Sequence, residues 1–246
     1  MRVRSLGTAL AAVGMVAAAS PASSQLVVGT STSANCFPFG CSAKSQDPLG
    51  FPSTFYQQVY AASNFSGSGF ISGLDFFLAP GFAGPLNSIT FTLSLSTTTL
   101  GLNVDGAGGI SSTNPNGNDG ANNTLFGTYT ISGSAPATLT FLGTPFFYDP
   151  SLGNLLLDLR VTSGTFNDIG VGLSAFFEAN FGDATEYSRV TDFGTEFTGT
   201  GLVTEFDYSG SIVSPVPEPA TLTLLGTGLV AMAGMGRRRK RTAATG

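Results

Sequence analysis

Residues able to do chemistry are few in this chain, and carboxylates dominate among them. The 246 residues include no His, two Cys and 15 Asp or Glu. Without His, a Ser-His-Asp or Cys-His hydrolase is excluded, and so is a zinc site that needs imidazole. Two Cys cannot supply a four-thiolate metal site either. The chemistry left to consider is that of paired carboxylates, oxygen ligands and one pair of thiols.

Two pairs of carboxylates have the close spacing of a candidate hydrolase site, Asp183 with Glu186 and Asp192 with Glu196. A glycosidase uses two carboxyl groups about 5–10 Å apart, one of them as the general acid. The segment 25–214 holds 14 acidic residues, so such pairs also arise by chance. We therefore expect no catalytic residues, and a secreted glycan hydrolase is the least favoured function.

Calcium is the one cofactor that the sequence brings into consideration. Asp105 and residues 114–123 offer carboxylates and carbonyls, which are the ligands that Ca²⁺ prefers. The segment lacks the closing Glu of a helix–loop–helix calcium site, and its Gly spacing differs from that pattern. A solvated loop is the simpler interpretation, so we expect no metal and no cofactor.

Cys36 and Cys41 bracket a short Phe-Pro-Phe-Gly segment. A local disulfide is favoured if the chain is exported into an oxidising compartment. A redox-active pair usually has two intervening residues rather than four, and free thiols are the other alternative. We expect a disulfide that pins the N-terminal arm and takes no part in catalysis.

Residues 1–24 have the layout of a secretory signal peptide. Arg2 and Arg4 precede an apolar run over residues 6–19, and small residues follow before Gln25. The run is short and Ala-rich for a membrane span, although a retained N-terminal anchor is the alternative. The pattern allows cleavage after Ala19, Ala22 or Ser24.

A second hydrophobic run covers residues 220–236. It has 17 residues and no charge, and as a helix it is roughly 25 Å long, the short end of what a bilayer core requires. Basic clusters stay on the cytoplasmic side, so the residues before the run should face outward. A buried helix of a soluble domain is the alternative. The basic stop-transfer cluster consists of Arg237, Arg238, Arg239, Lys240 and Arg241, and residues 242–246 form a cytoplasmic tail.

Two prolines restrict the backbone just before this run. Pro217 and Pro219 fix φ and remove two backbone donors, and each biases its predecessor, Val216 or Glu218, towards extended conformations. The segment should therefore be extended and accessible, as a protease or transpeptidase requires of the strand that it binds. A rigid spacer before a membrane span is the alternative.

The order of proline motif, apolar span and basic cluster resembles the PEP-CTERM sorting signal of exported bacterial proteins. The resemblance covers residues 215–241, with the motif at 216–219, the transmembrane helix at 220–236 and the cluster at 237–241. It implies secretion machinery and an exosortase-type processing enzyme as partners. It also implies an inner-membrane intermediate and a final place at the cell surface or in the extracellular matrix. The hosts of this family typically make extracellular polysaccharide, which is a further candidate partner.

Between the two ends, residues 25–214 indicate one β-rich ectodomain. Apolar and polar residues alternate over residues 88–96 and 154–162, as in half-buried strands, and no 3.6-residue period is sustained. About nine strands fit an antiparallel β-sandwich that is jelly-roll-like. The other expected strands are 55–61, 71–78, 137–142, 171–177, 188–193 and 201–208, with Leu125, Tyr129 and Ile131 sharing one face of another and Gly127 in phase.

Composition also separates the interior of this domain from its surface. The 21 Phe residues are expected to form most of the core. Residues 104–123 are rich in Gly, Asn and Ser with almost no apolar content, which predicts a mobile surface loop between hairpin strands. Two further stretches, 57–60 and 146–157, resemble a Phe- and Gly-rich ectodomain of PEP-CTERM proteins, and this looser resemblance implies no defined activity.

The charge of the domain limits its partners. Residues 25–214 contain 14 acids and three bases, so the domain should repel phosphate backbones and bind no nucleic acid. The favoured function is a non-catalytic exported surface or matrix protein. The alternative is a carbohydrate-binding module in which Phe146, Phe147 and Tyr148 are exposed and stack on sugars, although the chain has no Trp.

Overall fold

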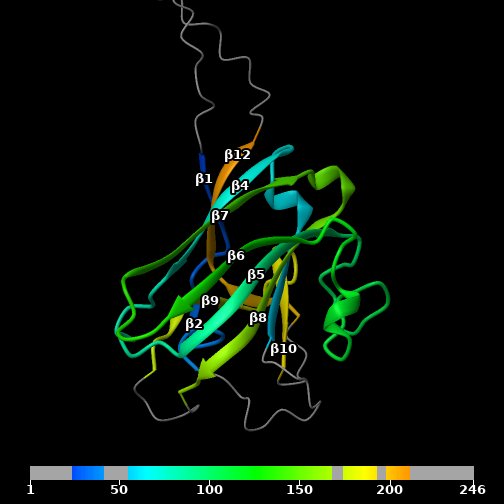
Figure 1. The fold of residues 1–246 in the computed structure, drawn as a ribbon. Coiled ribbons are helices and arrows are strands. Elements are labelled where there is room, and N and C mark those ends of the chain that lie inside the picture. The colour runs from blue at the N-terminus through cyan, green and yellow to red at the C-terminus, as the bar shows by residue number, and fades with distance from the viewer. Residues whose placement is uncertain (1–23, 42–54, 168–173, 193–197, 211–246) are drawn as a thin grey trace, which may run out of the picture.

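The computed structural model describes residues 24–41, 55–167, 174–192 and 198–210. These residues form an all-β structure in which every pairing between strands is antiparallel, as expected (Figure 1). The strands are β1 (Ser24–Val28), β2 (Ser33–Asn35), β3 (Phe55–Tyr60), β4 (Gly69–Phe77), β5 (Ser88–Thr98), β6 (Thr124–Ile131), β7 (Thr138–Tyr148), β8 (Asn154–Thr165), β9 (Phe177–Phe181), β10 (Tyr187–Thr191), β11 (Thr200–Leu202) and β12 (Thr204–Gly210). The short 3₁₀ turns are η2 (Ala62–Asn64), η3 (Pro115–Gly117) and η4 (Pro150–Leu152).

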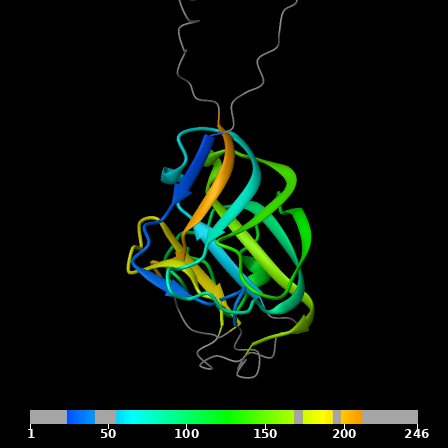
Figure 2. The same cartoon turned by 90° about the vertical axis from the view of Figure 1, so that its left-hand side faces the viewer.

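The strands form two larger sheets and a small one. The four-stranded sheet has the order β1-β12-β4-β7, the five-stranded sheet β10-β3-β8-β5-β6, and the three-stranded sheet β11-β9-β2. The two larger sheets pack face to face: the ring of Tyr60 lies 5.0 Å from that of Phe206, and the ring of Phe91 lies 5.5 Å from that of Phe141. Figure 2 shows them from the side. The body is therefore β-sandwich-like.

Alternation along β5 and β8 produces the core between these sheets. Ile89, Phe91, Leu93 and Leu95 of β5 are buried, as are Leu155, Leu157, Leu159 and Val161 of β8, which confirms the predicted faces. We call the apolar residues between the sheets the inner cluster. The predicted role of Phe is confirmed for the buried rings, which are Phe39, Phe55, Phe65, Phe76, Phe91, Phe126, Phe141, Phe146, Phe177 and Phe206.

The predicted face of β6 is wrong at its first residues. Leu125 is 53% exposed, whereas Phe126 is buried. The register explains the reversal, because Leu93 pairs with Gly127 while Ser94 pairs with Leu125, which leaves Phe126 as an extra residue. A β-bulge of this kind changes the phase of alternation.

Two other predicted strands have different bounds in the structure. The predicted strand 201–208 is two strands, because β11 pairs with β9 and β12 pairs with β1 and β4, with Val203 between them. The predicted strand 171–177 is wrong over residues 174–176, since β9 begins only at Phe177, and residues 171–173 lie outside the described residues. The sequence pattern did not predict the short edge strands β1 and β2. They pair with strands that are distant in the sequence, β12 and β9 respectively.

The segment between β5 and β6, residues 99–123, packs on the outer face of the five-stranded sheet, so the prediction of a mobile loop over 104–123 is wrong. We call this segment the covering loop. Its Val104 and Ile110 are buried. Together with four residues of the sheet they form the outer cluster, which contains Phe55, Val59, Val104, Ile110, Leu156 and Val190. Leu100 and Leu102 of the loop also pack against this cluster, so a few apolar side chains hold the loop where the sheet presents an apolar face to them.

The predicted signal peptide lies outside the described residues apart from Ser24, the first residue of β1. The predicted sorting segment 215–241 and tail 242–246 lie wholly outside them. Within the ranges that the structure describes, no helix is both long and apolar enough to span a membrane.

Candidate functional site

The two ends of the described body meet at one end of the four-stranded sheet. Ser24 of β1 pairs with Tyr208 of β12, and the Ser24 hydroxyl donates a hydrogen bond of 3.0 Å to the Tyr208 carbonyl. Gly210, the last residue of β12, pairs with Gly69 of β4. Figure 1 shows β1 and β12 side by side at the top of the sheet. We call this region the exit end, because the residues that lead to the predicted sorting motif follow Gly210.

The chain is anchored firmly at the exit end. Tyr208 is buried, and its hydroxyl donates a hydrogen bond to the carbonyl of Gly67. The ring of Phe65 lies 5.4 Å from that of Tyr208, 5.5 Å from that of Phe206 and 4.8 Å from that of Tyr148. A Cβ atom on Gly69 would lie 2.5 Å from the Gly210 Cα, so this close pairing requires glycine. A pull on residues after Gly210 would therefore be resisted by the core.

The exit end carries exposed aromatic side chains. Phe70 and Phe147 are 49% and 52% exposed, and their ring centroids lie 5.2 Å apart at an angle of 63°. The predicted platform of Phe146, Phe147 and Tyr148 is wrong for two of its members. Phe146 and Tyr148 are buried, because alternation along β7 turns them to the core and Phe147 outward. Sequence analysis missed Phe70, although counting back by one from the buried Ile71 would have placed it on the outer face.

Three carboxylates follow on the same outer face of the four-stranded sheet. Asp75 of β4 lies directly opposite Glu205 of β12, and Asp207 is two residues further along β12. Burial raises the pKa of Glu205, and the neighbouring charges of Asp75 and Asp207 raise it further. Among the described residues, no three His, Cys, Asp or Glu side chains are arranged to hold a metal ion. The outer face is thus acidic away from the exit end.

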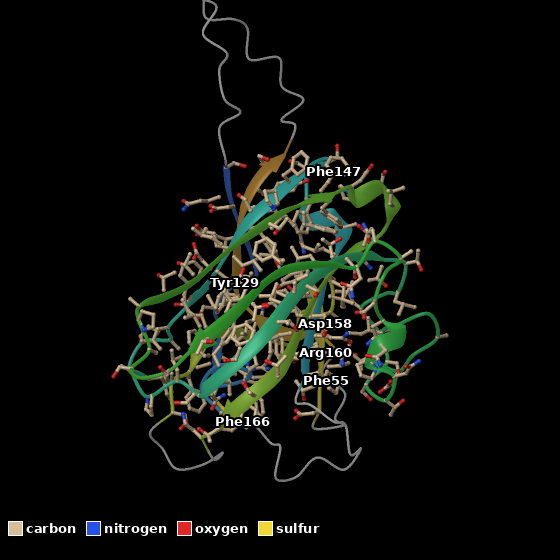
Figure 3. All side chains as sticks on the ribbon, in the orientation of Figure 1. Phe55, Tyr129, Phe147, Asp158, Arg160 and Phe166 are labelled. Atoms are coloured by element: carbon tan, nitrogen blue, oxygen red, sulfur yellow. A yellow bond between two sulfur atoms is a disulfide. The ribbon has the colours of Figure 1, made fainter. Side chains whose placement is uncertain are left out.

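A second charged group lies between the five-stranded sheet and the covering loop. The Arg160 Nε donates to both carboxylate oxygens of Asp158, at 2.7 and 2.9 Å, and its guanidinium carbon lies 5.3 Å from the centroid of the Phe55 ring (Figure 3). Burial raises the pKa of Asp119 to about 6; the charge of Asp158 raises it and that of Arg160 lowers it. Asp119 fastens the loop to the sheet, since the Gln57 Nε2 of β3 donates to the Asp119 Oδ1 at 3.3 Å.

The predicted carboxylate pairs are placed as follows. The Asp183 Oδ1 accepts hydrogen bonds from the Thr185 amide at 2.9 Å and from its hydroxyl at 2.5 Å, and these bonds lower the pKa of Asp183. Burial raises the pKa of Glu186, with a further contribution from the charge of Asp183. Asp192 is buried at the end of β10, and Glu196 lies outside the described residues. Asp183 thus stabilises a turn, and its charge opposes ionisation of Glu186.

The oxygen-rich segment considered for calcium uses its side chains internally. The Asp105 carboxylate accepts hydrogen bonds from the Ser112 amide at 2.8 Å and from the Ser112 hydroxyl at 2.5 Å. The Asn118 Nδ2 donates to the Gln57 Oε1 at 2.8 Å. These bonds order the covering loop and account for its polar composition.

Cys36 and Cys41 are joined in a disulfide, with their Cα atoms 5.2 Å apart. The segment between them presents Phe39 to the inner cluster. Its ring lies 4.9 Å from that of Phe76 and 5.4 Å from those of Phe141 and Phe177. The disulfide-bonded segment therefore contributes a central aromatic ring to the inner cluster.

Comparison with known proteins gives one match. Residues 215–240 match the family model for the PEP-CTERM protein-sorting motif. No curated protein and no solved structure matches the chain. The sorting motif implies an exported protein that passes through the membrane and is processed by an exosortase. The motif covers the predicted residues Val216, Pro217, Glu218 and Pro219 and the basic residues up to Lys240, so this chain carries a PEP-CTERM sorting signal.

Proposed function

We propose that this chain is a non-catalytic exported protein of the cell surface or extracellular matrix. Its β-sandwich is the cargo, and its C-terminal signal delivers that cargo to an exosortase. The observation that carries the proposal is the sorting motif, which starts at residue 215, five residues after the end of β12. The anchoring of Tyr208 in the core supports it, because a tail held at a membrane needs a firm attachment to the body.

The membrane stage of this route is part of the proposal. The signal peptide lies within residues 1–24, residues 220–236 span the inner membrane, and Arg237 to Arg241 stay in the cytosol. The absence of charge from 220–236 and the basic cluster after it support this arrangement. We also propose jelly-roll connectivity, supported by a chain that passes repeatedly between the two larger sheets.

Its non-catalytic character is supported by the engagement of its carboxylates. Asp158 is paired with Arg160, Asp183 with Thr185, and Asp105 with Ser112. A glycosidase instead requires two carboxyl groups that face a sugar across an open cleft. A glycan hydrolase therefore has less support than a structural role.

Association with exopolysaccharide is the ligand-binding part of the proposal, and a dedicated carbohydrate-binding module is the alternative. A sugar stacks on the flat face of an aromatic ring, and the rings of Phe70 and Phe147 meet at 63° rather than lying in one plane. The burial of Phe146 and Tyr148 removes the other members of the predicted platform. A glycan array probed with the exported protein would distinguish the two functions, since the module requires a defined glycan and the structural role does not.

The test is the intact mass of the mature protein from host cells with and without exosortase. We expect the tail to be removed or exchanged only when the enzyme is present. Glu218→Gln, which removes the charge between the two prolines, should reduce processing, whereas the matched change Glu205→Gln in β12 should leave it intact. Processing that does not depend on exosortase, or a full-length product in the cytosolic fraction, would contradict the proposal.

The same mass reports the N-terminal cleavage position. Cleavage after Ala19 or Ala22 leaves all five residues of β1, whereas cleavage after Ser24 deletes its first residue and the hydrogen bond to Tyr208. We therefore expect the mature chain to begin at residue 20 or 23. A start at Gln25 would show that this pairing is dispensable.

A further inference from the structure

Three exposed apolar side chains mark the exit end of the sandwich. Phe70 is the second residue of β4, Phe147 lies near the end of β7, and Leu152 closes η4, which follows β7. They are 49%, 52% and 66% exposed. The ring of Phe70 lies beside that of Phe147. Phe70 follows Gly69 and Phe147 precedes Tyr148 in the chain. Gly69 pairs with Tyr148 on one side and with Gly210 on the other. An aromatic pair at the surface of an otherwise acidic domain requires an explanation.

The length of chain after Gly210 limits what can cover this patch. Nine residues, 211–219, separate Gly210 from the apolar run at 220–236. At ~3.3 Å per residue, they reach at most roughly 30 Å. A body whose tail is held in a bilayer therefore keeps its exit end within roughly 30 Å of the lipid surface.

We propose that Phe70, Phe147 and Leu152 insert into the membrane interface while the sorting tail is in the bilayer. The patch would hold the sandwich upright on the membrane and present residues 211–219 to the processing enzyme. This inference rests on the proposed function, because it requires the membrane-held intermediate.

The surroundings of the patch also indicate which lipids it meets. Asp207 and Glu205 lie further along the outer face, and Asp149 lies next to the buried Tyr148 in sequence. Anionic headgroups would be repelled by these carboxylates. Contact should therefore be limited to the tip of the sheet and should be stronger with zwitterionic lipids. Acyl chains need no flat stacking surface, so the rings of Phe70 and Phe147 can insert among them although they meet at 63°.

The absence of Trp from the chain allows a clean test. Phe147→Trp places a single indole in the patch, which can be excited apart from the six Tyr. Phe82→Trp is the matched control: Phe82 is 46% exposed and its ring lies 5.0 Å from that of Phe176, much as Phe147 lies beside Phe70. Phe82 follows the opposite end of β4, whose nine residues at ~3.3 Å per residue place Phe77 roughly 26 Å from Gly69.

The full-length variants would be reconstituted into phosphatidylcholine vesicles with and without bromine on the acyl chains. Interfacial side chains enter ~5–10 Å below the headgroups, so we expect bromine to quench the indole at position 147 about twofold. The indole at position 82 should be unaffected. Replacing part of the lipid with phosphatidylglycerol should weaken the quenching at 147. Equal denaturation midpoints for the two variants would establish that both are folded.

Each other outcome has a defined meaning. If the chain floats with the vesicles but neither indole is quenched, or both are quenched equally, the patch does not contact lipid and the inference is wrong. A blue shift at position 147 without quenching by bromine would show that a second copy covers the patch, and quenching by an added glycan would show a sugar site; either overturns it. If the chain does not float at all, the membrane-held intermediate of the proposed function fails instead.

Discussion

The two apolar clusters on either side of the five-stranded sheet are built in different ways. The inner cluster is rich in aromatic rings that come from distant parts of the chain, and Phe39 contacts several of them. The outer cluster has six buried residues and is closed by Val104 and Ile110 of the covering loop, with Leu100 and Leu102 partly buried beside them. Hydrogen bonds of side-chain amides, such as that from the Asn118 Nδ2 to the Gln57 Oε1, also hold the covering loop on the sheet. A segment poor in apolar residues is therefore still ordered when its few apolar side chains and amides find buried partners.

The strongest test of the inner cluster is Phe39→Ala. We expect the free energy of unfolding to fall by about 3–5 kcal/mol, because the change leaves a cavity among four aromatic rings. Chemical denaturation with the disulfide intact would measure the loss. Phe181→Ala, at a ring that is 47% exposed, should change stability by less than about 1 kcal/mol. Equal losses of stability for the two variants would refute the role of Phe39 as a central core residue.

The corresponding test of the outer cluster is Ile110→Ala. We expect a loss of about 2–3 kcal/mol, towards the lower end for buried Ile, because the loop can close part of the cavity. Hydrogen exchange should rise in residues 99–123 and stay slow in β5 and β8. Leu125→Ala, at a side chain that is 53% exposed, is the control and should have little effect. Uniformly faster exchange throughout the sandwich would show that the clusters are one unit.

Two asparagines of the covering loop can test how much its side-chain hydrogen bonds contribute to stability. Asn118→Ala leaves the buried Gln57 Oε1 without its donor, so we expect a loss of about 1–2 kcal/mol. Asn122→Ala removes hydrogen bonds to Thr97 that are exposed to water, and about 0.5 kcal/mol should be lost. Thermal denaturation of both variants would compare them. A larger loss for Asn122→Ala would mean that burial does not control these bonds.

The smallest expected effect is a dependence on pH at the edge of the outer cluster. The pKa of Asp119 is raised from 3.8 to about 6 by burial and by the charge of Asp158. The folded state therefore holds this proton more tightly than the unfolded state, and its contribution to stability is full below about pH 4 and declines as pH rises through 6. Because Asp119 is half exposed, water screens the effect, which should stay below about 1 kcal/mol.

Asp119→Asn would isolate this contribution. The variant should be slightly more stable than the native protein at pH 7, and the two should converge at pH 4. Asp183→Asn should behave in the opposite way, since the pKa of Asp183 is lowered and its contribution is lost as pH falls. Stability curves of the three proteins from about pH 2 to pH 7 would measure both signs, because the contribution of Asp183 is lost only below its ordinary pKa of 3.8. A constant difference between native protein and Asp119→Asn would contradict the prediction.

Much of this protein follows from local sequence. Alternation with period two predicted the inner faces of β5 and β8 because each strand has one side against the core. The sorting signal was readable because its chemistry lies in consecutive residues, with Pro217 and Pro219 before an uncharged run and a basic cluster. Signals of this kind need no partner from elsewhere in the chain.

The other features depend on contacts between distant residues. The bulge at Phe126 reversed the face of Leu125, and the apolar outer face of the sheet ordered the covering loop. The pairing of β1 with β12 brought the two ends of the body together. Spacing along the chain carries no information about such partners. The sequence alone therefore determined an exported β-rich protein with a sorting tail. Tertiary structure decided which rings are buried and where the tail leaves the body, because register and packing set both.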